Sequence, residues 1–182
     1  ISQKGKARIA PINDAKGKPI TLLLSKDAVL RTPWQVSSFD GGDRCSLDII
    51  LTDELEALCV KIDDSVRACI EKDLDRYFKT PRKEDWYKPL RKEASKEGYA
   101  STMRTKLTIR EDRCSFKCWD EKKQPMTLEQ IGTNHWPSTA FACAATLHGV
   151  YFQSNNYGPL LEVTMLMDKP EDAECPFGEE ED

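Results

Sequence analysis

The chain has 182 residues and a mass of 20.7 kDa, with 39% hydrophobic residues, 32% charged residues and a mean hydropathy of −0.60. These values fit one soluble domain, or one domain with appendages, and the absence of any apolar run near about 18 residues excludes a membrane-spanning helix. The formal net charge is −4, but eight acids and one base fall in residues 168–182, which leaves 26 bases and 23 acids on residues 1–167. A mildly basic body therefore precedes a strongly acidic tail.

The cysteine content indicates the compartment. Seven cysteines form an odd count, and Cys59 and Cys69 fall among the apolar positions of a helix, so we expect free thiols rather than a disulfide scaffold. No apolar segment follows the cations of residues 1–10, so no secretory signal peptide is expected. The sequence predicts an intracellular, reducing compartment, which for a viral protein is the nucleus or a viral replication site.

The first fifty residues predict a basic arm followed by an antiparallel meander. Residues 1–19 carry lysines, prolines and glycines without periodicity and predict an irregular N-terminal arm. Short apolar or alternating runs predict three strands, with a turn at residues 40–43 before the third. The three strands are expected at residues 20–24, 28–36 and 46–51. Pro33 favours an edge position or a bulge for the second strand.

The hydrophobic period then changes to about 3.6, which predicts a long amphipathic helix. Apolar residues recur at three- and four-residue steps from Leu55 to Phe78. Asp53 can cap this helix with Glu56 three residues later, and Pro81 ends it after Lys79. The expected helix has about 25 residues.

The remainder of the chain predicts further strands around a basic connection. Residues 79–110 contain ten bases and four acids. Strands are expected at residues 102–109, 113–119, 147–153 and 160–167, with a helical turn at 127–131. The Asn, Gly and Pro residues of the loop 154–159 predict that the last two strands form a hairpin. We therefore expect a domain over residues 20–167.

A catalytic or metal site is not expected. The chain has two histidines, His135 and His148, and they are not spaced as a pair on one helix face. No nucleophile elbow or phosphate-binding glycine loop accompanies them, so the chain is not predicted to be an enzyme. Cys114 and Cys118, if both lie in one strand, stand about 13 Å apart, too far for one tetrahedral zinc. We expect no metal and no cofactor.

The basic region with interleaved aromatic residues is typical of proteins that hold single-stranded nucleic acid. Such proteins combine a positive groove for phosphates with aromatic faces on which bases stack. The candidate binding residues are Arg31, Trp34, Lys79, Arg82, Lys83, Trp86, Tyr87, Lys88, Arg91, Lys92, Arg104, Lys106 and Arg110. The alternative is that the cations solvate a connection while the tryptophans fill the core.

The acidic tail suggests regulation. Carboxylates attached to a basic body can occupy the cationic groove in competition with nucleic acid and, once displaced, recruit basic partners; the alternative is a solubilising tail. The candidate regulatory residues are Glu171, Asp172, Glu174, Phe177, Glu179, Glu180, Glu181 and Asp182.

Two segments resemble a known viral family. The stretch Gly149-Val-Tyr-Phe-Gln-Ser-Asn-Asn-Tyr-Gly158, followed by Leu160-Leu-Glu-Val-Thr164, is similar to the late hairpin of single-stranded DNA-binding proteins of podophages and of large nucleocytoplasmic DNA viruses of algae. Leu30-Arg-Thr-Pro-Trp34 resembles the first-strand region of the same group.

The resemblance implies a mainly β protein, an OB-fold-like β-barrel with one long amphipathic helix between strands three and four. It further implies single-stranded DNA binding in replication and recombination, with Trp34 and the basic residues of 79–110 on the DNA. The tail of residues 168–182 is then expected to contact replication proteins and to support a homodimer. Family tails tend to end in an aromatic residue, whereas here Phe177 is followed by Gly178 and four acids.

Two other functions fit the same charges. The chain can be a self-assembling structural protein whose basic connection docks a neighbouring subunit, or an adaptor with an OB-like fold that binds protein or carbohydrate. The first predicts filaments or sheets in the absence of nucleic acid, and the second predicts that oligonucleotides do not compete with its ligand.

Overall fold

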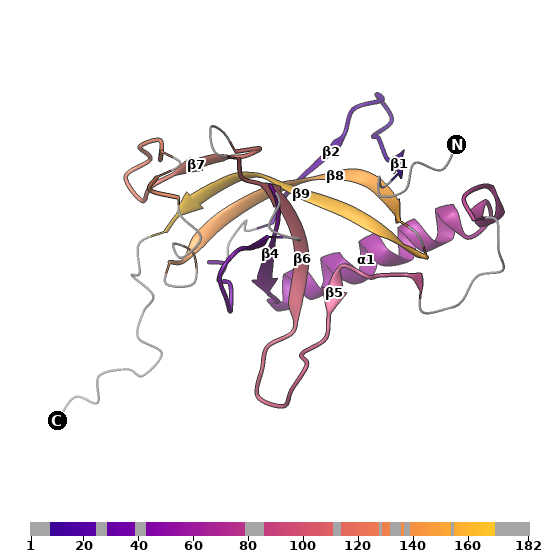
Figure 1. The fold of residues 1–182 in the computed structure, drawn as a ribbon, viewed down its shortest axis with the longest axis horizontal. Coiled ribbons are helices and arrows are strands. Elements are labelled where there is room, and N and C mark those ends of the chain that lie inside the picture. Colours follow the sequence, from indigo (N-terminus) through magenta and orange to yellow (C-terminus); the bar gives the residue numbers. More distant parts are fainter. Residues whose placement is uncertain are drawn as a thin grey trace.

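A long β-hairpin dominates the computed structural model of the chain (Figure 1). The structure describes residues 8–24, 29–38, 43–78, 86–110, 114–127, 129–131, 136, 139–153 and 155–169. Within these residues, nine strands form one mixed sheet and a single α-helix lies against it. The protein is therefore mainly β, as the sequence predicted.

The hairpin consists of β8 (Phe141–Gln153) and β9 (Asn156–Asp168), which pair antiparallel from Phe141↔Asp168 to Gln153↔Asn156. The predicted hairpin is confirmed, but both strands are longer than expected. Residues 156–159, expected in the connecting loop, belong to β9, and Gly158 passes so close to the Lys88 carbonyl that an added Cβ would lie 2.2 Å from its oxygen. Close packing of Gly158 against the segment around Lys88 therefore extends β9 toward the hairpin turn.

Three short strands flank the hairpin. β1 (Arg8–Pro11) and β2 (Ile20–Leu23) pair antiparallel with successive parts of β8, and β7 (Lys117–Trp119) pairs parallel with β9. The strand expected at 20–24 is confirmed and that at 113–119 is shorter than expected. The prediction of an irregular arm was wrong for β1, since the edge of β8 supplies hydrogen-bond partners that the local sequence does not reveal.

The other half of the sheet is built on β6 (Thr102–Thr108), which meets β9 in parallel at Lys106↔Glu162 and runs steeply to the hairpin (Figure 1). β4 (Arg44–Ile50) pairs antiparallel with β6 along its whole length. β3 (Ser37–Ser38) adds to β4, and β5 (Arg91–Lys92) adds to β6. The strands expected at 46–51 and 102–109 are confirmed.

The strand expected at 28–36 does not form. Leu30 exchanges two hydrogen bonds with Phe141, and the Arg31 carbonyl accepts one from Ile50, after which the chain turns at Pro33 and the Thr32 hydroxyl bonds to the Trp34 carbonyl. Proline cannot donate to a ladder, which ends the pairing. Among the described residues no continuous ladder joins the two ends of the sheet, so the sheet is open there.

The helix α1 spans Asp53–Ile70 and packs against β5, β6 and β9. The Thr52 hydroxyl accepts a hydrogen bond from the Leu55 amide, so Thr52 rather than Asp53 caps the helix. The helix ends at Ile70, nine residues before the predicted end, and a 3-10 turn (η1, Leu74–Arg76) follows.

An aromatic cluster explains the early end of α1. Tyr77 stacks on Phe152 with ring centroids 4.2 Å apart, and Phe78 packs edge-on against Trp86, Phe152 and Tyr157. Reaching these rings takes the chain off the helix axis. Much later in the chain, a hydrogen bond from the Ile131 amide to the Thr127 carbonyl confirms the helical turn expected at 127–131.

No helix among the described residues is long and apolar enough to span a membrane.

Candidate nucleic-acid interface

The two faces of β6 differ in chemistry because side chains alternate along a strand. Met103, Thr105 and Leu107 are buried in the core that α1 covers, whereas Arg104 and Lys106 point to the opposite face. β4 follows the same pattern, so Arg44 and Asp48 share that opposite face with them.

Five cations gather on this face. Lys92 of β5 joins it as the register partner of Thr102, and Arg110, two residues beyond the end of β6, is brought to the end of this face by its ion pair with Asp43, the residue before Arg44. We call this set the cationic face. Its members are Arg44, Lys92, Arg104, Lys106 and Arg110.

Lys106 lies at the centre of the cationic face and is partly buried. Its pKa is lowered to about 8, first by burial and then by the neighbouring Arg104, against the opposing effect of Asp48. Arg44 lowers it further. Both arginines therefore lie near enough to Lys106 for their charges to act on its ammonium group.

Carboxylates neutralise only part of the cationic face. Lys92 is paired with Asp48 at 3.0 Å, and Arg110 with Asp43 at 3.0 Å. Among the described residues, no carboxylate lies within ion-pair distance of Arg44 or Arg104. These two exposed arginines therefore present uncompensated charge.

Aromatic rings border the cationic face at two places. The Lys92 ammonium lies 5.1 Å from the centroid of the Trp34 ring, which is 37% exposed. Tyr151 of β8 lies near Arg104. Burial raises the pKa of the Tyr151 hydroxyl, and the charge of Arg104 partly opposes this rise. One open ring therefore stands beside the cations.

An acid marks the boundary of this surface on β9. Glu162, the parallel partner of Lys106, holds the His148 imidazole at 2.9 Å. His148 thus engages the carboxylate beside the central lysine.

Trp86 and Tyr87, both expected to stack on bases, lie in the core. They are 8% and 7% exposed, and Trp86 packs against Phe78. The Tyr87 hydroxyl donates to Asp63 at 2.5 Å, the Arg67 guanidinium covers its ring, and burial raises its pKa. Rings closed in this way offer no face to a base, which is the alternative the sequence left open.

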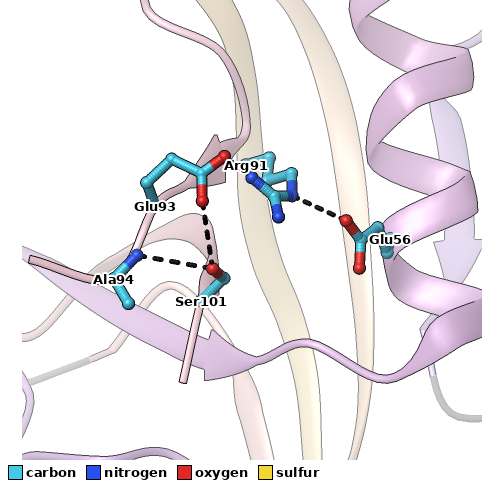
Figure 2. A network of polar contacts seen from close by, with 5 residues as sticks. All are labelled: Glu56, Arg91, Glu93, Ala94 and Ser101. Atoms are coloured by element: carbon cyan, nitrogen blue, oxygen red, sulfur yellow. Dashed lines mark hydrogen bonds and ion pairs between the residues drawn. The ribbon is translucent and has the colours of Figure 1, made fainter. Parts of the chain in front are cut away.

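Arg91 is also separated from the cationic face. It is the register partner of Met103 and therefore points toward α1, where it bonds Glu56 at 2.9 Å and contacts Glu93 (Figure 2). Glu93 in turn accepts from the Ser101 hydroxyl, which accepts from the Ala94 amide. This network joins the base of the β5–β6 hairpin to the helix.

Of the other predicted residues, Arg31 and Lys88 are described by the structure and the rest are not. Arg31 is exposed and bonds β4 through its carbonyl, and Lys88 is half-buried with its amide on Tyr157. The remaining candidates lie outside the described residues, namely Lys79, Arg82, Lys83, Glu171, Asp172, Glu174, Phe177, Glu179, Glu180, Glu181 and Asp182. Asp168, expected to open the tail, belongs to β9.

Two interface residues were missed by the sequence analysis. Arg44 alternates with Ser46 and Asp48 and would have been found had the strand been started two residues earlier. Tyr151 carries no local signal, because its approach to Arg104 depends on the hairpin crossing β6.

The described surface suits anion binding rather than metal binding. Among the described residues, no group of three or more histidine, cysteine or acidic side chains is placed to hold a metal ion. The cationic face offers guanidinium and ammonium donors to phosphate oxygens, with an indole at its border.

Comparison with known proteins identifies the fold. No protein-family description and no curated protein matches the sequence. Among solved structures, the single-stranded DNA-binding protein from bacteriophage Enc34 superposes with a TM-score of 0.55 at 10% identity, covering 96% of each chain. Its C-terminal truncation gives 0.55 at 8% identity, covering 91% of this chain and 96% of that one.

A third structure is the Enc34 protein in complex with single-stranded DNA, with a TM-score of 0.53, 10% identity, and coverage of 94% of this chain and 99% of that one. The structural neighbours are thus phage single-stranded DNA-binding proteins, and at these identities the likeness is one of fold.

Proposed function

We propose that the chain is a sequence-independent single-stranded DNA-binding protein that acts in DNA replication and recombination. The observation that carries the proposal is the cationic face, with two uncompensated arginines and the exposed Trp34 beside it. A fold shared with phage proteins of this activity supports it. We also propose that the chain belongs to the subgroup of such proteins found in podophages and in large DNA viruses of algae.

The proposed fold is an OB-like barrel with α1 between its third and fourth barrel strands. Residues 30 and 31 support this arrangement, since they hydrogen-bond both to β8 at Phe141 and to β4 at Ile50 and so bridge the two ends of the open sheet. In this assignment β4, which carries Arg44, is the third barrel strand, and the third strand is one of the two on which OB-folds bind oligonucleotides.

Binding follows from charge and stacking. Each cation that neutralises a phosphate releases counterions, with a log–log salt slope of about −0.7 per contact on single strands. A base stacked on Trp34 adds about 1–3 kcal/mol without regard to its identity. Neither contribution distinguishes one base sequence from another.

The acidic tail regulates this surface in our proposal. Its carboxylates compete with DNA for the cationic face and, when displaced, contact replication proteins or a second copy of the chain in a homodimer. The net charge of residues 168–182 is opposite in sign to that of the body, which supports this competition.

Fluorescence anisotropy of a labelled oligothymidine tests the proposal. The full chain is compared at low and moderate salt with a version ending at Lys169, because β9 extends through Asp168. We expect micromolar or tighter binding that weakens with salt and strengthens on truncation. Absence of binding by both forms refutes DNA binding, and equal affinity of both at low salt refutes the competing tail.

A self-assembling structural protein is the second candidate. Leu23 and Met165 are 62% and 42% exposed and lie at one level of the sheet, because both pair with Ala144. Exposed apolar side chains at a sheet surface favour association between copies. Filaments or sheets seen by electron microscopy without nucleic acid would favour this candidate.

A further inference from the structure

The cationic face is arranged along β6 and not across the sheet. Thr102, Arg104, Lys106 and Thr108 are successive positions on one face of this strand, and Arg110 follows two residues after Thr108. The two threonines have cationic partners at their own level, since Lys92 pairs with Thr102 and Arg44 with Thr108. Over this length, each of these positions therefore either is a cation or has a cation as its register partner.

The spacing of these cations suits a polymer of regularly spaced charges. Same-face positions of a strand are about 6.8 Å apart, so the four steps from Lys92 to Arg110 extend over about 27 Å. Successive phosphates of an extended single strand repeat on the same scale. A strand laid along β6 meets a cation at each phosphate.

A path across the sheet meets a different surface. The residues at the level of Lys106 are Thr21 of β2, Thr146 of β8, Glu162 of β9 and Ser46 of β4. The Thr21 and Thr146 hydroxyls bond each other at 3.3 Å, and Glu162 is an acid. Lys106 is the single cation on this line, so phosphates crossing the strands would meet one cation and one carboxylate.

Each end of the β6 path is closed by a distinct feature. Trp34 lies beside Lys92 at one end. A pocket of about 330 Å³ lined by Thr108, Arg110, Cys114 and Ser115 lies at the other. The carboxylates along the path are held by cations or by histidine, Asp48 by Lys92, Asp43 by Arg110 and Glu162 by His148.

We propose that single-stranded DNA lies parallel to β6, with about five consecutive phosphates on the cationic face, one end at Trp34 and the other at the pocket beside Arg110. The inference rests on the proposed function and specifies the path of its ligand. Five contacts give a salt slope of about −3.5. The binding site is filled by about six nucleotides, at the low end of the range for an OB-fold.

Photocrosslinking of the full chain tests the path. Two oligothymidines of eight nucleotides carry one 4-thiothymidine, at the 5′ end in one and at the 3′ end in the other, and crosslinked peptides are identified by mass spectrometry. We expect the two probes to mark opposite ends of β6, one near Trp34 and Lys92 and the other near residues 108–115. Crosslinks divided between β2 or β8 on one side and β3 on the other would overturn the path.

Charge-removing variants give a second readout. Arg44→Gln and Arg110→Gln should each reduce the salt slope by about 0.7 and weaken binding about fivefold at 0.1 M salt. Lys117→Gln, at an exposed position of β7, is the matched control and should change neither. An unchanged slope for Arg44→Gln and Arg110→Gln contradicts the path, and so does a Lys117→Gln effect of equal size.

The two proposals fail in different ways. If the full chain does not bind oligothymidine, the proposed function is wrong. If it binds but the crosslinks cross the strands, the function stands and the path along β6 is wrong.

Discussion

The lowered pKa of Lys106 predicts that DNA affinity falls with pH in a range where other lysines stay charged. With a pKa of about 8, the ammonium is charged in about nine molecules of ten at pH 7 and in about one of ten at pH 9. Neutral Lys106 makes no phosphate contact. The salt slope should therefore fall by about 0.7 between these pH values.

The expected loss of affinity follows from the same contact. At 0.1 M salt, a slope of about 0.7 corresponds to about a fivefold change in the dissociation constant. Anisotropy titrations of a labelled oligothymidine at pH 7, 8 and 9, each at three salt concentrations, measure both quantities. Bound phosphate favours the ammonium, so the midpoint in the complex should lie above that of the free protein.

Two variants isolate the lysine. Lys106→Arg keeps the charge at every pH and should flatten the profile, whereas Lys106→Gln should bind at all pH values as the wild type does at pH 9. The folding equilibrium should move the other way: the folded pKa lies below the ordinary value of 10.5, so stability should rise as pH increases from about 8 toward 10.5. A wild-type affinity that is constant from pH 7 to 9, or a fall retained by Lys106→Arg, would refute the assignment.

Three further changes probe separate parts of the structure. Asp63→Ala removes the acceptor of the Tyr87 hydroxyl and should lower the free energy of unfolding by about 2–4 kcal/mol in a urea titration, because buried donors lose their partner; an unchanged midpoint would contradict the network. Gly149→Ala places a Cβ 2.0 Å from the Ala10 carbonyl oxygen at a φ of +146°, so amide exchange of β1 should accelerate, and unchanged protection would count against the close approach. Trp34→Ala should cost about 1–3 kcal/mol of oligothymidine binding while leaving the salt slope unchanged, and a slope change would assign Trp34 to charge organisation instead of stacking.

Elements with a strong period were predictable from the sequence. The start of α1, the strands β4 and β6, and the β8–β9 hairpin carry alternation or helical spacing that local reasoning detects. β1 has no such pattern, since its strand character depends on the free edge of β8. The end of α1 was missed because Tyr77 continues the helical period and yet leaves the helix to stack on Phe152.

The candidate interface was only half predictable, because composition does not assign a face. Arg91 and Lys92 are adjacent and were both predicted to contact DNA, yet alternation directs the first to Glu56 on α1 and the second to Trp34. Trp86 and Trp34 likewise look alike in sequence, while one is 8% and the other 37% exposed. The face of the sheet on which a side chain lies follows from the register of its strand, and strands distant in the sequence set this register.

The pairing of β8 with both β1 and β2, from the early part of the chain, and β9, from the late part, has a consequence for the order of folding. Thr21 and Thr146 are 125 residues apart in the sequence and neighbours in the sheet. During synthesis, β1 and β2 emerge first and have no edge to join until β8 and β9 are complete, and sheets built from such distant pairings form slowly. The early strands and the apolar side of α1 therefore stay open to chaperones, or to other nascent chains, until almost the last residue of β9 has left the ribosome.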